Sequence, residues 1–219
     1  MQYSKLNCKT EDLKTLWETV FGDTREVTDA FFENAFFPDG CFYESIDGKA
    51  VSALYLLPVT LGDEKGFYLY AAATLPEHRG RGLMGRLIKE ALAYAKAQAD
   101  FVYLCPAEAS LYDYYRRFGF SKMLYARFAD ENESRPLTSA QAFFDKTKSM
   151  PTTPLFFMGV YCYAAAIGCE MYENGAVRFD GQFVFPSAYP SGNLKPYGML
   201  CPLSDAEFSD NIFSFLTMN

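Results

Sequence analysis

The stretch LPEHRGRGLMGRLIKEAL, residues 75–92, decides the fold of this chain. Three glycines and three arginines lie within residues 79–86, and apolar residues recur at helical spacing from Leu83 to Ala91. The first N–H groups of a helix have no intrahelical partner, and the helix dipole favours an anion beside them. Glycines let an anion approach the backbone, and arginines add charge-assisted bonds. The stretch therefore predicts a helix over 83–97 whose start binds an anion; the alternative is an ordinary glycine-rich loop with solvated arginines.

Strand and helix signals alternate around this stretch. Apolar, strand-like runs occupy 66–75, 100–107 and 120–129, and a short helical pattern occupies 110–119. Upstream, two helical patterns precede two strands joined at an Asp47-Gly48 turn. The order strand, helix, strand, helix, strand from about residue 70 to 129 indicates an α/β layer with parallel pairing in its middle.

A polar stretch, DENESRP at 130–136, is the best candidate for a domain boundary. Beyond it lie a predicted helix at 139–149, a turn at Asn174-Gly175 and an aromatic, β-leaning region. We therefore expect a first domain over 1–129 and a smaller, aromatic-rich α+β extension over 130–219.

Composition excludes several classes of function. A net charge of -7 argues against nucleic-acid binding, which needs a basic face. The apolar stretch 154–169 is too short to span a bilayer, and neither a signal peptide nor a membrane anchor is expected. Six scattered cysteines and a single histidine, His78, argue against a structural metal site and predict reduced thiols and a cytoplasmic location. The sequence does not indicate the oligomeric state.

Two phosphate-binding motifs do not fit the glycine-arginine turn. A P-loop would need a Lys-Ser/Thr pair that the turn lacks. The string at 80–85 has the letters GxGxxG, but it follows antiparallel strands, and no ribose-binding acid ends the next strand near residue 105.

The string ATLPEHRGRGLMGRLIKEAL at 73–92, followed by a strand and then LYDYYRRFGF at 111–120, resembles the GNAT superfamily of acyl-CoA N-acyltransferases. The shared patterns are Arg/Gln-x-x-Gly-x-Gly/Ala at a helix start and Tyr-x-x-x-Gly-Phe on a later helix. Within the superfamily, both strings are most similar to the enhanced intracellular survival branch. The resemblance covers residues 1–129 and implies a mixed sheet flanked by helices.

The resemblance also implies a coenzyme site. Backbone N–H groups of the turn are implied to hold the diphosphate of acetyl-CoA, a co-substrate, while its pantetheine arm pairs with the preceding strand as an added strand does. The implied coenzyme-binding residues are Ala73, Thr74, Leu75, Arg79, Gly80, Arg81, Gly82, Leu83, Met84, Gly85 and Ser110. Met84 departs from the usual Gly/Ala, and Ser110 is also expected to cap the 110–119 helix. No metal is expected.

Tyr115 is the implied general acid, which would assist the departing thiolate. The sequence does not identify the general base. The candidates are Glu44 on an earlier strand, Asp113 on the helix of Tyr115, and the terminal carboxylate of Asn219. Asp113 is a weaker candidate because its side chain is expected to face solvent.

The expected reaction is acetyl transfer from acetyl-CoA to a primary amine by direct attack in a ternary complex, without an acyl-enzyme. The acceptor is a small-molecule or peptide amine, and the acidity of the chain mildly favours a cationic one. Two alternatives remain: a non-catalytic acyl-CoA sensor, and an interaction module whose turn binds no coenzyme.

Overall fold

Two helices precede the first strand. The computed structural model describes residues 9–150, 153–179, 181–186, 190 and 192–208. Helix α1 (Thr10–Phe21) buries Leu13, Leu16 and Trp17 and ends at Gly22, whose φ of 75° is left-handed. Helix α2 (Arg25–Asn34) buries Phe31. The two helices therefore turn their apolar stripes to the same core.

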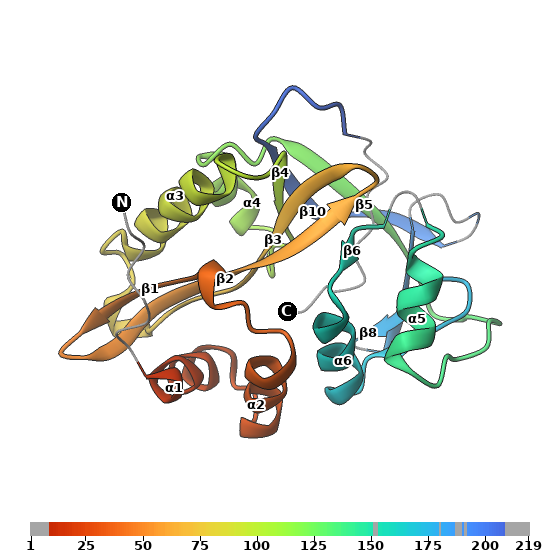
Figure 1. Ribbon diagram of the computed structural model, residues 1–219, viewed down its shortest axis with the longest axis horizontal. Coiled ribbons are helices and arrows are strands. Elements are labelled where there is room, and N and C mark those ends of the chain that lie inside the picture. Colours follow the sequence, from red (N-terminus) through yellow and green to blue (C-terminus); the bar gives the residue numbers. More distant parts are fainter. Residues whose placement is uncertain (1–8, 151–152, 180, 187–189, 191, 209–219) are drawn as a thin grey trace.

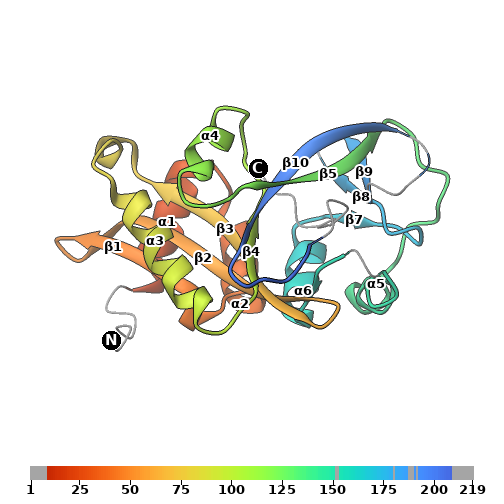
Figure 2. The same ribbon diagram turned by 90° about the horizontal axis from the view of Figure 1, so that it is seen from above.

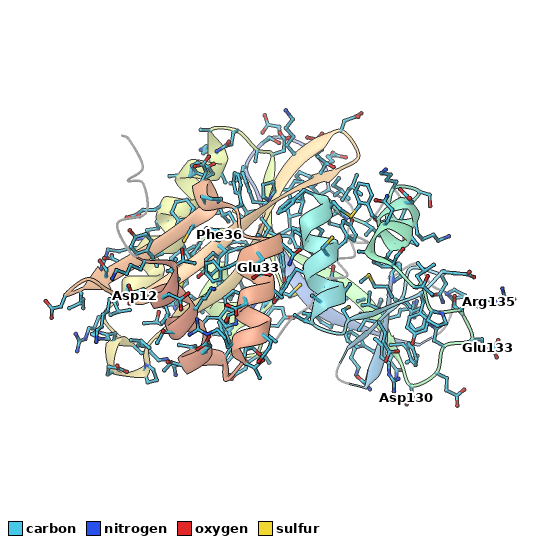
Figure 3. All side chains as sticks on the ribbon, turned by 60° about the horizontal axis from the view of Figure 1, so that its bottom comes forward. Asp12, Glu33, Phe36, Asp130, Glu133 and Arg135 are labelled. Carbon is cyan, nitrogen blue, oxygen red and sulfur yellow. The ribbon has the colours of Figure 1, made fainter. Side chains whose placement is uncertain are left out.

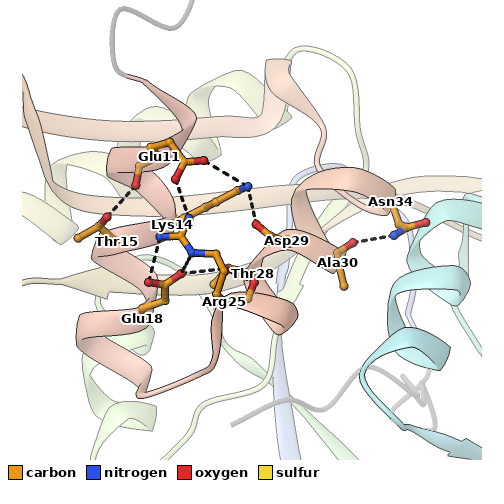
Figure 4. A network of polar contacts seen from close by, with 9 residues as sticks. All are labelled: Glu11, Lys14, Thr15, Glu18, Arg25, Thr28, Asp29, Ala30 and Asn34. Carbon is orange, nitrogen blue, oxygen red and sulfur yellow. Dashed lines mark hydrogen bonds and ion pairs between the residues drawn. The ribbon is translucent and has the colours of Figure 1, made fainter.

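A network of ion pairs and hydrogen bonds joins α1 to α2 (Figure 4). Arg25 Nη1 lies 2.6 Å from Glu11 Oε2 and Arg25 Nε lies 2.9 Å from Glu18 Oε1. Lys14 Nζ lies 2.6 Å from Asp29 Oδ1, and this contact raises the pKa of Lys14. These contacts join residues along α1 to the first half of α2.

The strands within the described residues form one ten-stranded mixed sheet in the order β1-β2-β3-β4-β10-β5-β9-β8-β7, with β6 paired to β2. The strands are β1 (Cys41–Ile46), β2 (Lys49–Leu61), β3 (Glu64–Thr74), β4 (Phe101–Leu104), β5 (Lys122–Ala129), β6 (Leu155–Phe156), β7 (Glu170–Met171), β8 (Val177–Phe179), β9 (Gln182–Pro186) and β10 (Asn193–Pro202). The β3–β4 pair is parallel, and the other pairs are antiparallel. The predicted hairpin at Asp47-Gly48 joins β1 to β2.

Helices cover both faces of the first half of this sheet (Figure 1). On one face, α3 (Leu83–Lys96) and α4 (Leu111–Arg116) pack over a core that contains Leu54, Leu69 and Phe120. On the other face, α1, α2 and α6 (Met158–Ala166) enclose an aromatic core around Trp17 and Phe31. Helix α5 (Ala140–Thr147) packs against α6, and short 3-10 turns occupy Pro38–Gly40 and Pro76–His78. This arrangement confirms the predicted mixed sheet flanked by helices.

The chain after residue 130 begins at one end of the molecule and returns to its centre. Asp130, Glu133 and Arg135 lie at the end opposite Asp12 of α1 (Figure 3). Strand β10 then enters the sheet between β4 and β5 (Figure 2), and β6 extends β2. A division at residues 129 and 130 stays a prediction; the hydrogen-bonded sheet itself continues across that point.

The predicted helix at 139–149 is present as α5, and Ser139 caps it by accepting a hydrogen bond from the Ala142 N–H at 3.2 Å. The predicted turn at Asn174-Gly175 joins β7 to β8. Of the helices in the described part of the chain, none is both long and apolar enough to cross a membrane.

Candidate active site

The parallel strands β3 and β4 separate part of the way along the sheet. They pair only at Gly66–Phe101, Phe67–Val102 and Tyr68–Tyr103. Beyond this point β3 runs on to Thr74, whereas β4 ends at Leu104. Among the described residues, no strand pairs with the facing edges of β3 and β4 beyond this point.

A β-bulge lies in β3 at the same level. Tyr70 pairs with Tyr55 and Ala73 with Ala53, so Ala71 and Ala72 together oppose one residue of β2. Ala71 has a φ of 46°, a left-handed conformation that costs an L-residue roughly 1–2 kcal/mol. Bulges next to functional sites redirect side chains, and here the consecutive residues Ala71 and Ala72 both line one cavity. The run of three alanines from Ala71 to Ala73 therefore includes a strained bulge at this cavity.

The cavity has a volume of about 550 Å³ and is lined by residues from both faces of the sheet. From the face covered by α3 and α4 it is lined by Arg79, Met84, Glu108, Leu111, Tyr114 and Tyr115. From the face covered by α1 it is lined by Val20, Phe21, Tyr68, Tyr70, Ala71 and Cys105. Since Thr74 and Leu104 of the separated strands also line it, the cavity passes through the sheet where the strands part.

The start of α3 lies beside this cavity. Gly82 occupies the N-cap position with a φ of 74°, and no side chain caps the helix there. The first N–H groups of α3, from Leu83 to Gly85, have no intrahelical carbonyl. A methyl group on Gly80 would meet nothing within 4 Å, and one on Gly82 only the Arg86 side chain at 4.0 Å. The helix start therefore has N–H groups without intrahelical partners beside open space; an anion site there stays a prediction.

Gly85 differs from these two glycines. A methyl group there would lie 3.4 Å from the Phe118 ring and 3.9 Å from the Tyr114 hydroxyl oxygen. These neighbours lie on and just after α4. The absence of a side chain at Gly85 thus allows α3 and α4 to approach each other, while the adjacent Met84 lines the cavity.

The three arginines of the turn have different neighbours. Arg79 lines the cavity, and its Nε donates to the Thr74 carbonyl oxygen at 3.2 Å. Arg81 Nη1 lies 3.4 Å from His78 Nδ1. Arg86 Nε donates to Glu44 Oε1 at 3.0 Å and so ties α3 to β1. Of the three arginines, only Arg79 is among the residues that line the cavity.

Tyr115 lies on α4 with 8% of its surface exposed. Its ring packs against Tyr114 and Phe120 at centroid distances of 5.3 and 5.9 Å. Burial raises the pKa of Tyr115 to about 12, and the neighbouring Tyr114 adds to the shift. The hydroxyl therefore keeps its proton at neutral pH.

The start of α4 differs from the prediction. Ser110 occupies the N-cap position, but it makes no capping bond; its hydroxyl lies 3.1 Å from Glu108 Oε2, to which it donates. The expectation that Ser110 caps this helix was wrong, because its φ of -61° is helical, and a capping residue needs an extended backbone. Glu108 lines the cavity, whereas Ser110 is not among the residues that line it.

The implied coenzyme-binding residues fall into three groups. Thr74, Arg79 and Met84 line the cavity together with Tyr115. Residues 80–83 and Gly85 form the adjoining helix start. Ala73 is buried in the core on the α1 side, and the N–H of Leu75 donates to the Val51 carbonyl at 3.0 Å.

The candidate bases lie away from the cavity lining or outside the described residues. Glu44 is paired with Arg86. Asp113 is 86% exposed at its side chain, pairs with Arg116 at 2.5 Å and faces solvent as predicted. Asn219 lies outside the described residues. No group of three or more His, Cys, Asp or Glu side chains within the described part of the chain is placed to hold a metal.

Several lining residues were not singled out from the sequence. They come from the end of α1 (Val20 and Phe21), from β3 (Tyr68) and from the residue after β4 (Cys105). Burial raises the pKa of the Cys105 thiol to about 12, which its hydrogen bond with Tyr68 offsets in part. Neither local pattern nor spacing points to these residues, because only the packing of α1 across the separated strands brings them together.

Comparisons with known proteins agree with this geometry. Residues 7–123, more than half of the chain, match the family model described as an acetyltransferase (GNAT) domain. No curated protein shows significant sequence similarity to the chain.

Solved structures share the fold over most of the chain. Eis1 from Mycobacterium abscessus aligns with a TM-score of 0.61 and 12% identity over 91% of this chain and 72% of its own. A GCN5-related N-acetyltransferase from Anabaena variabilis aligns with a TM-score of 0.61 and 12% identity over 90% of this chain and 72% of its own. A GCN5-related N-acetyltransferase from Kribbella flavida aligns with a TM-score of 0.58 and 14% identity over 90% of this chain and 71% of its own. The likeness to these structures concerns the fold alone; the family match and the shared sequence patterns establish that the chain belongs to the GNAT acetyltransferase family and is an acyltransferase of that type.

Proposed function

We propose that the protein transfers an acetyl group from acetyl-CoA to a primary amine by direct attack within a ternary complex. The observation that carries this proposal is one cavity that is lined by the separated strands β3 and β4, by Arg79 and Met84 near the start of α3, and by Tyr115 of α4.

The α3 side of the cavity suits the coenzyme. The open helix start from Gly80 to Gly85 would receive the diphosphate through backbone N–H groups, and the Arg79 guanidinium would balance part of its charge. The pantetheine arm would then lie in the gap between the strands, along Ala72 and Thr74 of β3. This path directs the thioester toward Tyr115.

The chemistry requires one new bond and two proton movements. The neutral amine attacks the thioester carbonyl, the carbon–nitrogen bond forms, and the amine passes its surplus proton to solvent. The carbon–sulfur bond breaks, and the sulfur leaves with both electrons of that bond. The Tyr115 hydroxyl donates a hydrogen bond to this sulfur and stabilises its negative charge.

The pKa of Tyr115 decides how far its proton moves. A pKa of about 12, against about 8.5 for an ordinary thiol, makes complete transfer from the phenol to the thiolate uphill by about 5 kcal/mol. A strong hydrogen bond without complete transfer is therefore the role that fits Tyr115, and solvent protonates the thiolate after release.

Direct attack is favoured over an acyl-enzyme because of the state of Cys105. It is the cysteine among the residues that line the cavity, and its pKa of about 12 keeps the thiol protonated near neutral pH. A protonated thiol is a weak nucleophile. Transfer through Cys105 is thus disfavoured.

The test is incubation of the purified protein with acetyl-CoA and a library of amines, followed by mass spectrometry for acetylated products. Primary amines should yield acetylated products, and coenzyme A should be released in an equal amount. Initial rates measured with both substrates varied should give intersecting double-reciprocal lines. Binding of acetyl-CoA without any acetylated amine would refute the transferase proposal and favour an acyl-CoA sensor. Parallel lines would refute direct attack.

A further inference from the structure

We infer that the acceptor is a primary amine carried on an aromatic or aliphatic body, which packs against an apolar chamber on the α1 side of the cavity. This inference rests on the proposed function and names its substrate class. It differs from the cationic acceptor that the net charge mildly favours.

The chamber consists of the lining residues on the face opposite α3: Val20, Phe21, Tyr68, Tyr70, Ala71 and Cys105. The coenzyme fits the α3 face, where the open helix start and Arg79 lie. An amine that attacks the thioester between the strands must then approach from the α1 face. The walls of this chamber are aromatic rings and short aliphatic side chains.

Phe21 is the rim of the chamber. It lines the cavity, and yet 41% of its surface is exposed, which makes it one of the exposed large apolar residues of the described chain. Its ring makes an edge contact with Trp17 at a centroid distance of 5.8 Å. An exposed phenyl ring at a cavity mouth gains free energy when an apolar ligand covers it.

The position of this rim is fixed from both sides. Gly22 ends α1 directly after Phe21, and the ion pairs of Arg25 with Glu11 and Glu18 hold α2 against α1 (Figure 4). Phe21 is therefore presented by a braced helix end, and little ordering of the rim is needed when a ligand binds.

The inner wall is neutral and fixed as well. Burial raises the pKa of Tyr68 and of Tyr70 well above the ordinary value, so both phenols stay uncharged. The Tyr70 hydroxyl lies 3.0 Å from the Tyr163 hydroxyl of α6, and Tyr68 stacks on Tyr103 at 4.7 Å. These contacts hold two aromatic surfaces in place for a hydrophobic substrate.

The charged groups near the chamber are not among its lining residues or lie on the other face. Asp23 follows Phe21 by two residues, but it is not among the lining residues, and its Oδ2 accepts a hydrogen bond from the Trp17 indole at 2.7 Å. Glu108 and Arg79 line the cavity from the α3 and α4 face. An amine that bears an apolar body therefore matches the chamber better than one that bears a second ammonium group.

The experiment compares three primary amines. Heptylamine has the same chain length as hexamethylenediamine but carries a methyl group in place of the distal ammonium group. Phenethylamine carries an aromatic body. With acetyl-CoA saturating, we expect kcat/KM for heptylamine and phenethylamine to exceed that for hexamethylenediamine by about tenfold or more, which corresponds to ~1.4 kcal/mol.

A variant at the rim assigns this preference to the chamber. Phe21→Ser should lower kcat/KM for heptylamine and phenethylamine by about fivefold to tenfold, mainly through KM, and change hexamethylenediamine by less than about twofold. Phe157→Ser is the matched control, because Phe157 is 38% exposed and is not among the residues that line the cavity. It should leave all three values unchanged.

The outcomes separate the inference from the function on which it rests. Acetylation of hexamethylenediamine at a kcat/KM equal to or above that of heptylamine would overturn the apolar-acceptor inference and leave the transferase intact. An unchanged preference in Phe21→Ser would overturn the chamber as its cause. Absence of acetylated product from every amine, with acetyl-CoA still bound, would overturn the proposed function and the inference with it.

Discussion

The hydroxyl oxygens of Tyr70 and Tyr163 lie 3.0 Å apart in the core between the sheet and α6. Tyr70 belongs to β3 and lines the cavity, whereas Tyr163 belongs to a helix that follows residue 130. Their rings also meet edge to face at 6.3 Å. The later part of the chain thus supports a wall of the candidate active site, beyond adding β10 to the sheet.

Tyr163→Phe removes one hydrogen-bond partner from the buried Tyr70 hydroxyl. We expect the free energy of unfolding to fall by about 1 kcal/mol, the usual value of such a bond, and KM for the amine to rise more than KM for acetyl-CoA. Urea denaturation and initial rates measure the two effects. Tyr125→Phe, on the half-buried Tyr125 of β5, serves as the control, and equal changes in both KM values would contradict a role for Tyr163 on the acceptor side.

Tyr115→Phe should lower kcat by about 10²-fold or more, because the departing sulfur loses its hydrogen-bond donor. The ring and its contacts with Tyr114 and Phe120 remain, so the Kd for coenzyme A, measured by calorimetry, should change little. Since the pKa of Tyr115 is about 12, the wild-type kcat should not fall between pH 7 and about 10 through loss of this proton. A fully active Tyr115→Phe variant would contradict the assignment of Tyr115 as the general acid.

Gly82→Ala tests the start of α3. An alanine at a φ of 74° is strained, and stability should fall by roughly 1–2 kcal/mol. The methyl group also enters the open space beside the helix start, so the Kd for coenzyme A should rise by about tenfold.

Gly62→Ala is the matched control for this effect. Gly62 has a φ of 60° in the turn between β2 and β3, and a methyl group there also meets nothing within 4 Å. It should cost similar stability without a change in coenzyme affinity. If both variants weaken binding equally, the helix start is not the diphosphate site.

Glu44→Gln decides whether this carboxylate acts as the base. Because Glu44 pairs with Arg86 and is not among the cavity-lining residues, we expect kcat to change by less than about twofold. The ion pair is partly exposed, so stability should fall by about 0–1 kcal/mol. A fall in kcat of about 10²-fold, with a lost limb in the pH–rate profile, would restore Glu44 as the base.

Alkaline pH should unfold the protein between about pH 10 and 12. The pKa of Tyr115 is raised by burial to about 12, and the pKa values of Tyr68 and Tyr70 are raised in the same direction. Above pH 10 the unfolded chain loses phenol protons that the folded chain retains, so this stability is complete below about pH 10 and is lost as the pH approaches 12. Tyr115 alone accounts for about 2.7 kcal/mol, two pKa units at 1.36 kcal/mol each.

Phenolate absorbance and near-ultraviolet circular dichroism, followed together, check this prediction. A first group of exposed tyrosines should ionise without loss of the dichroism signal, and a second group only as that signal disappears. A single ionisation step centred near pH 10 with the fold intact would show that the buried phenols are not shielded.

Much of the first half of the fold could be predicted from the sequence. The helix after the glycine-arginine turn, the hairpin at Asp47-Gly48 and the parallel strand pair are all present. The capping role of Ser110 was not, because its φ of -61° is helical and a capping residue needs an extended backbone. Local patterns predict such elements well, but they do not fix the backbone conformation of the single residue before a helix.

The sequence by itself determined that a helix begins at Leu83 with its N–H groups uncovered, since glycines at 80 and 82 can take left-handed φ values and cannot supply a cap. It also placed Tyr115 on a short helix ahead of Gly119 and Phe120. Only the tertiary structure decided that β3 and β4 separate, that β10 fills the sheet beside β4, and that Phe21 reaches the cavity from α1. The reason is physical: backbone preferences act within a few residues, whereas a cavity exists only where packed elements from distant parts of the chain fail to close upon one another.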